Sequence, residues 1–258
     1  MISPVLLLPP LLALADEAGR SILAARAQGL GSRAKPDGSP VTEADRGAER
    51  LIVAGLGALT PNIPVIAEES CPSGMAPGSV GEMFWLVDPL DGTREMLAGR
   101  DEFTVNIALI IAGRPVLGVV TAPALDHAWW GSAGQGSCRR GAGGTVSIRA
   151  RRAPPGETVA CASRSHRDPT TDAWLAERGI TRINAIGSSL KFCLIAQGEA
   201  DLYPRFGRTM EWDTAAGHAI LAAAGGRVET LDGASLAYGK PGFVNPAFIA
   251  FGATDRPC

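Results

Sequence analysis

The stretch WLVDPLDGT, residues 85–93, places two aspartates directly behind an apolar run. Such a short run predicts a buried β-strand, so Asp88 and Asp91 would leave the strand at its buried end. A carboxylate there loses its hydration and needs a compensating partner. No Lys, Arg or His lies between Phe84 and Thr93 to provide one. The sequence therefore raises the question of what neutralises the two aspartates.

Further carboxylates lie at the ends of other predicted elements. Glu68 and Glu69 end the β-rich run IPVIAEES, Asp45 lies in VTEAD, and Asp213 lies at the start of an Ala-rich helix pattern. Proteins of the α/β class commonly place functional side chains at strand ends and in the loops that follow. Two like charges about 4 Å apart cost roughly 4 kcal/mol at a surface-like dielectric, so converging carboxylates need a cation. Oxygen ligands without His or Cys favour Mg²⁺ over Zn²⁺.

The residues after the strand offer a second kind of site. Pro89 fixes the backbone, so that the carbonyl of Leu90 can join the metal ligands. Gly92 and Thr93 come at the start of a predicted helix, TREMLAG, whose N–H groups and dipole favour an anion. A metal beside a phosphate cradle indicates phosphoryl chemistry.

Each of these acids also has a purely structural interpretation. Asp91 can be a helix N-cap or a residue of an Asp-Gly turn. Asp45 can be the acidic member of a capping box that Thr42 begins. Glu68 and Glu69 can form a solvated strand end. The spacing alone leaves the metal interpretation and the structural one open.

Composition excludes several other classes of protein. The 258 residues carry a net charge of -2 and no basic stripe, which argues against nucleic-acid binding. Five widely spaced cysteines without a C-x-x-C pair argue against a disulfide framework or a zinc site and suit a reducing compartment.

The N-terminal segment MISPVLLLPPLLALAD resembles a signal peptide but lacks a positive n-region and is interrupted by prolines. Leu11, Leu14, Ala18 and Ile22 recur at helical spacing, which predicts an amphipathic helix. No other segment is long and apolar enough to span a bilayer. We expect a cytoplasmic protein, and the apolar start leaves peripheral association with the inner membrane open.

The pattern of elements changes near residue 150. Before it, residues 103–123 read as a hairpin with its turn at 112–114. After it, predicted strands and helices alternate, which is typical of an α/β lobe. We therefore expect an N-terminal α+β metal-binding lobe over residues 1–150 and a C-terminal α/β lobe with the substrate-specificity residues over 151–258.

Several motifs together identify a family. SPVTEAD (39–45), WLVDPLDGT (85–93), EFTVNIALI (102–110) and EWDTAAGHAI (211–220) follow one another as in the inositol monophosphatase superfamily. Over nearly its whole length the chain resembles these Mg²⁺-dependent, lithium-sensitive phosphatases, and within them the bacterial 3'(2'),5'-bisphosphate nucleotidases. The resemblance implies an α/β (α+β) fold, a layered αβαβα sandwich of the inositol monophosphatase and sugar phosphatase type.

The resemblance also implies roles for the acidic residues. Two to three Mg²⁺ ions per site would be held by Glu68, Asp88, Asp91, Asp213 and the carbonyl of Leu90. Thr93, linked to Asp45, would orient and deprotonate the attacking water, with Glu68 as a further catalytic residue. The N–H groups of Gly92 and Thr93 would hold the scissile phosphate. Lys35 falls where the family often has a basic residue near the metals.

The nucleotidases further imply contacts from the C-terminal half of the chain. The implied substrate-binding residues are Gly92, Thr93, His166, Ser188, Lys191, Arg205 and Asp213. Two cations and a helix N-terminus suit a second phosphate that is not cleaved. The alternative is that Lys191 and Arg205 are surface charges and that Ser188 only caps its helix.

The implied reaction converts 3'-phosphoadenosine 5'-phosphate to AMP and phosphate, and the 5'-phosphosulfate analogue is a further candidate substrate. Such an enzyme would clear a by-product of sulfate assimilation. The alternatives are an inositol-1-monophosphatase, a broad sugar-phosphate phosphatase, or a catalytically silent regulator, which would be expected to lose Asp45 or Thr93. The expected partner is a small-molecule nucleotide, with a monomer and a homodimer both open.

Overall fold

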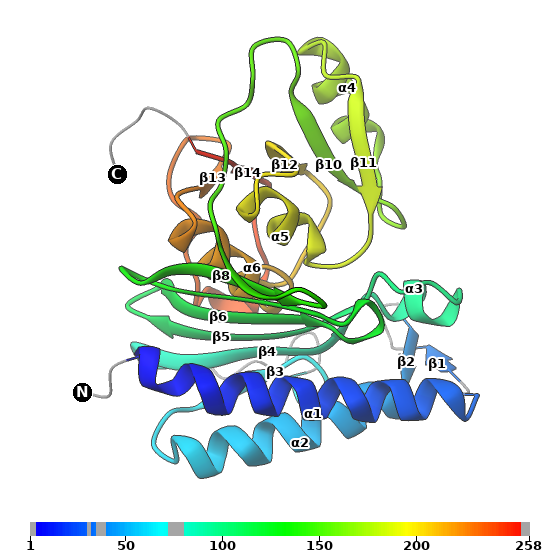
Figure 1. Ribbon diagram of the computed structural model, residues 1–258, viewed down its shortest axis with the longest axis vertical. Coiled ribbons are helices and arrows are strands. Elements are labelled where there is room, and N and C mark those ends of the chain that lie inside the picture. Colours follow the sequence, from blue (N-terminus) through cyan, green and yellow to red (C-terminus); the bar gives the residue numbers. More distant parts are fainter. Residues whose placement is uncertain (1–3, 30–31, 35–39, 72–79, 254–258) are drawn as a thin grey trace.

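The computed structural model describes residues 4–29, 32–34, 40–71 and 80–253, with the backbone alone for 32–34. Two helices, a seven-stranded sheet, two more helices, a five-stranded sheet and an outer helix follow one another as layers (Figure 1). The predicted αβαβα sandwich is confirmed. Lys35 lies outside the described residues.

The larger sheet occupies the N-terminal half of the chain. Its strands lie in the order β3-β4-β5-β6-β7-β8-β9 and are antiparallel except for the parallel pair β3 and β4. They are β3 (Val65–Ala67), β4 (Met83–Asp91), β5 (Thr104–Ile111), β6 (Arg114–Ala122), β7 (His127–Ser132), β8 (Gly136–Gly141) and β9 (Gly144–Ile148). A small separate pair joins β1 (Ser32–Ala34) to β2 (Pro40–Thr42).

The smaller sheet has the order β11-β10-β12-β14-β13. Its strands are β10 (Val159–Ser163), β11 (Arg182–Ile186), β12 (Leu202–Arg205), β13 (Arg227–Thr230) and β14 (Phe248–Phe251). The helices are α1 (Leu8–Ala27), α2 (Glu43–Leu59), α3 (Thr93–Leu97), α4 (Pro169–Glu177), α5 (Leu190–Ala196) and α6 (Glu211–Ala223), with 3₁₀ turns η1 (Pro4–Leu7), η2 (Pro123–Leu125) and η3 (Pro241–Phe243). The predicted boundary near residue 150 falls between β9 and β10, but the division into two domains stays a prediction because one core touches both sheets.

Strand β4 contributes to both apolar cores, which explains why its sequence does not alternate. Phe84 and Leu86 pack into the core that α5 and α6 share with both sheets. Trp85 and Val87 point to the opposite face and pack against α1 and α2. Because successive strand residues face opposite sides, a strand covered on both sides is apolar throughout. This burial on both faces fixes the end of β4, where the aspartates lie.

Helix α6 packs unusually close to the larger sheet. A Cβ atom at Gly118 of β6 would lie 2.3 Å from the carbonyl oxygen of Ala216. Only glycine allows the two backbones to approach so closely. The contact fixes the height of α6 above the sheet and with it the position of Asp213 in its first turn.

The local predictions agree with the structure. Thr42 begins α2 with a capping box, and β5 joins β6 through a two-residue turn at 112–113. Leu11, Ala18 and Ile22 of α1 are fully buried. Within the part of the chain that the structure describes, no helix is long and apolar enough to cross a membrane.

Candidate active site

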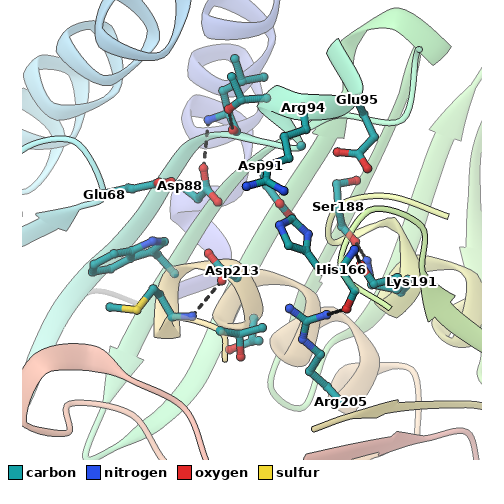
Figure 2. A pocket seen from close by; sticks show the side chains of 18 of the residues that line it. Glu68, Asp88, Asp91, Arg94, Glu95, His166, Ser188, Lys191, Arg205 and Asp213 are labelled. Atoms are coloured by element: carbon teal, nitrogen blue, oxygen red, sulfur yellow. Dashed lines mark hydrogen bonds between the residues drawn. The ribbon is translucent and has the colours of Figure 1, made fainter. Parts of the chain in front are cut away.

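A cavity of about 360 Å³ opens where the end of β4 meets the first turns of α5 and α6. Its wall combines residues from both halves of the chain (Figure 2). It includes the residues predicted to form the site, namely Glu68, Asp88, Leu90, Asp91, Gly92, Thr93, His166, Ser188, Lys191, Arg205 and Asp213. Asp45 is not on the wall but is hydrogen-bonded to Thr93.

Four of the acids come together at one side of this cavity. Glu68 follows β3, Asp88 and Asp91 belong to the end of β4, and Asp213 lies in the first turn of α6. The β4–β5 pairing shifts register between Asp88 and Asp91, where Pro89 lacks an N–H group to donate. Because of this irregularity, both aspartates line the cavity although they are three positions apart.

The electrostatics show that burial and mutual repulsion outweigh the nearby protein cations at Asp88, Asp91 and Asp213. Burial raises the pKa of Asp88 well above its usual range, and the charges of Glu68, Asp91 and Asp213 raise it further. Burial also raises the pKa of Asp91 to about 6, against the opposing charge of Lys191. For Asp213, burial followed by the charges of Asp91 and Glu68 raises the pKa to about 8. A bound cation would reverse these shifts.

The donor set fits Mg²⁺ in a specific way. Among the described residues, no three His, Cys, Asp or Glu side chains converge closely enough to hold a metal ion by themselves. Mg²⁺ does not require such a cage, because it keeps several waters and binds through one or two carboxylates plus substrate phosphate. Pairs of these acids, with water and phosphate completing the shell, therefore suit Mg²⁺ better than Zn²⁺.

Leu90 and Thr93 are held by the turn that follows β4. The backbone N–H of Leu90 donates to Oδ1 of Asp88 over 3.0 Å. The hydroxyl of Thr93 lies 3.1 Å from the Leu90 carbonyl and 2.9 Å from Oδ1 of Asp45. The predicted link between Thr93 and Asp45 is therefore present, and a role for the Leu90 carbonyl as a metal ligand stays a prediction.

Both interpretations of Asp45 hold at once. Its Oδ2 accepts the N–H of Thr42 over 2.7 Å, as a capping box requires, and also accepts the Thr42 hydroxyl over 2.7 Å. Its Oδ1 remains available to Thr93. One carboxylate thus caps α2 and orients the hydroxyl at the cavity.

The predicted phosphate cradle is shorter than the sequence pattern indicated. Gly92 has φ +93°, and a Cβ atom there would lie 3.0 Å from the carbonyl oxygen of Glu102, so glycine is required. Helix α3 then spans only Thr93–Leu97, a single turn. Its dipole is correspondingly weak, and anion binding by the N–H groups of Gly92 and Thr93 stays a prediction.

The two predicted cations are buried and already partly engaged. Lys191 donates to the carbonyl of Ser188 over 2.5 Å and lies 5.1 Å above the ring of Tyr203. Burial lowers its pKa. Arg205 donates to the carbonyls of His166 and Arg208 over 3.0 and 3.1 Å. The interpretation of both as surface charges is wrong, since their relative exposures are 5% and 7%.

Arg205 nevertheless keeps binding capacity. Its Nε atom is buried without a hydrogen-bond partner in the described structure. His166 lies beside it, and partial burial together with the charges of Arg205 and Arg94 lowers the pKa of its imidazole. Ser188 has φ +51°, a strained backbone for a residue other than glycine. Its hydroxyl makes only a long 3.5 Å contact with the Leu190 N–H, so helix capping explains it poorly.

Sequence reasoning missed several residues on the cavity wall. They are Pro40, Arg94, Glu95, Ser163, Phe192, Tyr203, Arg208, Thr209, Met210, Trp212 and Thr214. Arg94 and Glu95 directly follow the DPLDGT motif, and this adjacency was a usable signal. Trp212 precedes Asp213 in the same way. The remaining residues carry no pattern that distinguishes a cavity wall from ordinary core.

Comparison with known proteins identifies the family. The sequence model of the Inositol monophosphatase family matches residues 7–253. The 3'(2'),5'-bisphosphate nucleotidase CysQ of Salmonella typhimurium is 48% identical over 215 residues, covering 83% of this chain and 86% of the relative. CysQ of Escherichia coli strain K12 is also 48% identical, over 216 residues, with coverage of 83% and 86%.

Solved structures extend the comparison. CysQ from Bacteroides thetaiotaomicron is similar with a TM-score of 0.80 and 35% identity, covering 94% of this chain and 95% of the other. An inositol monophosphatase from Zymomonas mobilis is similar with a TM-score of 0.76 and 27% identity, covering 93% and 90%. The resemblance read from the motifs is confirmed, and the chain belongs to the inositol monophosphatase family.

Proposed function

We propose that the chain is a Mg²⁺-dependent phosphatase that removes the 3'-phosphate of 3'-phosphoadenosine 5'-phosphate, giving AMP and phosphate. The observation that carries this proposal is one cavity with two chemically different sides. Carboxylates, three of which have raised pKa values, line one side, and the buried cations Lys191 and Arg205 line the other. We expect a substrate with two phosphates to place one phosphate on each side. The relatives named as bisphosphate nucleotidases support the same choice.

The chain's own residues divide the work of hydrolysis. Mg²⁺ held by Glu68, Asp88, Asp91, Asp213 and the Leu90 carbonyl would offset the phosphate charge, activate water and stabilise the leaving oxygen. The Thr93 hydroxyl, oriented by Asp45 over 2.9 Å, would hold the attacking water and transfer its proton.

The side with the cations would bind and position the nucleotide. Arg205 has an unpaired Nε to offer an oxygen of the 5'-phosphate, and Lys191 adds charge from a fixed position. Ser188 and His166 lie beside them on the same wall (Figure 2). Energy from this remote contact would serve binding and orientation of the scissile phosphate. The 5'-phosphosulfate analogue carries the same remote group and is proposed as a second substrate.

A substrate panel with the purified protein tests this function. We expect the highest kcat/KM with 3'-phosphoadenosine 5'-phosphate, lower values with inositol 1-phosphate and fructose bisphosphate, no activity in EDTA, and inhibition by lithium. A wild-type preference for inositol phosphate would instead make the chain an inositol or broad sugar-phosphate phosphatase. Activity that persists in EDTA would refute the metal-dependent mechanism.

Variants of the cations sharpen the test. Loss of a charge-assisted hydrogen bond is worth roughly 1.5–3 kcal/mol, so Arg205→Ala should lower kcat/KM about ten- to a hundredfold on the bisphosphate. Lys191→Met keeps the buried apolar stem and removes the charge. Both variants should change the rate on inositol phosphate much less. Equal losses of kcat/KM on the two substrates would show that these residues support the fold. Their hydrogen bonds to backbone carbonyls are consistent with such a role.

A further inference from the structure

Glu95 is an acidic residue on a part of the cavity wall that also carries the cations Arg94 and Lys191. It lies on α3, its relative exposure is 3%, and Arg94, His166 and Lys191 line the cavity around it (Figure 2). A carboxylate here repels the phosphates that the cations attract. Its presence therefore needs a reason, because buried acids are rarely kept without a partner.

The surrounding residues fix the Glu95 side chain in one position. The hydroxyl of Ser165 donates to Oε1 over 2.5 Å. A Cβ atom at Gly187 would lie 2.7 Å from Cγ and 2.9 Å from Cδ of Glu95, so glycine at this position makes room for the acid. Within the described residues, no hydrogen bond occupies Oε2. The carboxylate is thus fixed through one oxygen and retains an acceptor.

The position of Glu95 relates it to both sides of the cavity. Along the chain it follows Asp91 by four residues. It also packs directly on Gly187, which precedes Lys191 by four. Its charge raises the pKa values of Asp91, Lys191 and His166. Glu95 is thus close to the end of β4 through α3, and to the turn before α5 through Gly187.

Glu102 provides an informative contrast. It too is an acid between the two halves of the chain, but its oxygens are occupied by Arg164 and by the N–H of Gly187. It does not line the cavity. Glu102 therefore links the two halves of the chain through Arg164 and Gly187. Glu95, in contrast, keeps an acceptor oxygen that faces the cavity.

We propose that Glu95 accepts a hydrogen bond from the free ribose hydroxyl next to the cleaved phosphate. This inference rests on the proposed function. In a nucleoside 3',5'-bisphosphate the sugar lies between the two phosphates, and its 2'-hydroxyl is the donor the sugar offers. An ionised carboxylate is an acceptor only, so it selects a hydroxyl and rejects a phosphate. Glu95 is thereby assigned as a residue that distinguishes ribonucleotides from deoxyribonucleotides.

The test compares 3'-phosphoadenosine 5'-phosphate, which is adenosine 3',5'-bisphosphate, with its 2'-deoxy analogue. We expect wild type to prefer the ribonucleotide in kcat/KM, and Glu95→Ala to reduce this preference about ten- to a hundredfold. The loss should fall on the ribonucleotide, with the deoxy substrate little changed. Glu95→Gln, which keeps a neutral acceptor and the side-chain shape, should give an intermediate preference. The 2'-hydroxyl also alters the intrinsic reactivity of the substrate. The decisive quantity is therefore how much the ratio of kcat/KM for the ribonucleotide to kcat/KM for the deoxyribonucleotide changes from wild type to each variant.

The control is Glu102→Gln, which disturbs the neighbouring acid and should leave the ratio unchanged. A ratio unaffected by Glu95→Ala and Glu95→Gln would overturn the inference. The inference would also be overturned if Glu95→Ala lost a preference for adenosine over inosine 3',5'-bisphosphate, because Glu95 would then contact the base. If wild type fails to hydrolyse adenosine 3',5'-bisphosphate at all, the proposed function itself is wrong. The two failures are therefore distinguishable.

Discussion

Replacing Asp213 with asparagine should stabilise the protein when Mg²⁺ is absent. The Asp213 carboxyl is crowded by burial and by the charges of Asp91 and Glu68, which raise its pKa from 3.8 to about 8. Asparagine removes the charge and retains an oxygen for the hydrogen bond that Oδ2 accepts from the Met210 N–H over 2.8 Å. Any gain in stability would therefore come from removing a buried charge and its repulsion by Asp91 and Glu68.

The magnitude and its pH dependence follow from the raised pKa. A shift of about four units corresponds to roughly 6 kcal/mol for a group shielded completely from solvent. Asp213 is only partly buried at the cavity, and its charge also favours the helix N-terminus, so we expect a net gain of about 2 kcal/mol. Because the folded pKa exceeds the unfolded one, the wild-type penalty is absent below pH 3.8 and grows as pH rises towards about 8.

Thermal unfolding in EDTA at pH 5 and pH 8.5 measures this effect. At pH 8.5 the variant should melt about 4–8 °C above wild type, with a smaller difference at pH 5. Added Mg²⁺ should stabilise wild type more than the variant, since it binds the folded carboxylates. Asp126→Asn, at an exposed position with φ +53° that asparagine also tolerates, is the matched control and should change little. A variant no more stable than wild type at pH 8.5 would refute the argument that burial and repulsion of the Asp213 charge destabilise the metal-free protein.

Three further outcomes concern the support of the site. Glu49→Ala removes the buried acceptor that holds the turn after Glu68. We expect it to lower the free energy of unfolding in urea by about 2–4 kcal/mol and to raise the Mg²⁺ concentration for half-maximal activity. An unchanged Mg²⁺ dependence would contradict this role. Burial lowers the pKa of His218 to about 3, so its neutral form stabilises the fold above pH 6.5. As pH falls from 6 to 5, the free energy of unfolding of wild type should fall by about 1 kcal/mol per pH unit relative to His218→Gln. Parallel pH profiles for the two proteins would contradict this prediction. Gly118→Ala should cost about 1–3 kcal/mol, since its Cβ would meet the Ala216 carbonyl at 2.3 Å; unchanged urea unfolding would show that α6 can shift.

The sequence predicts those parts of the fold that local chemistry determines. The cap at Thr42 and the turn at 112–113 follow from short patterns, and both are present. The apolar run of β4 predicts burial but not direction, because a strand covered on both faces has no alternation. That Trp85 faces α1 and α2 while Phe84 faces α5 and α6 depends on residues far away in sequence. Sheet order and the packing of α6 between the sheets are non-local for the same reason.

The candidate site divides in the same way. Acids at strand ends could be predicted to converge, because strand ends meet at a sheet edge. Lys191 and Arg205 could be predicted to face the cavity only through the family resemblance, and their hydrogen bonds to backbone carbonyls left no trace in the sequence. Adjacency to the DPLDGT motif was the one signal that pointed to Glu95, because a single helical turn has no periodicity to read.

The structural and chemical interpretations of an acid are compatible because a carboxylate has two oxygens. Asp45 gives Oδ2 to the cap of α2 and Oδ1 to Thr93. Asp213 gives Oδ2 to the first turn of α6 while its other oxygen remains for the cavity. Capping fixes the orientation of the carboxylate, so little side-chain freedom remains to be lost when a water or a cation binds. A capping acid beside a cavity is therefore a better candidate for chemistry than a mobile one, and a capping-box motif in a sequence does not by itself argue against function.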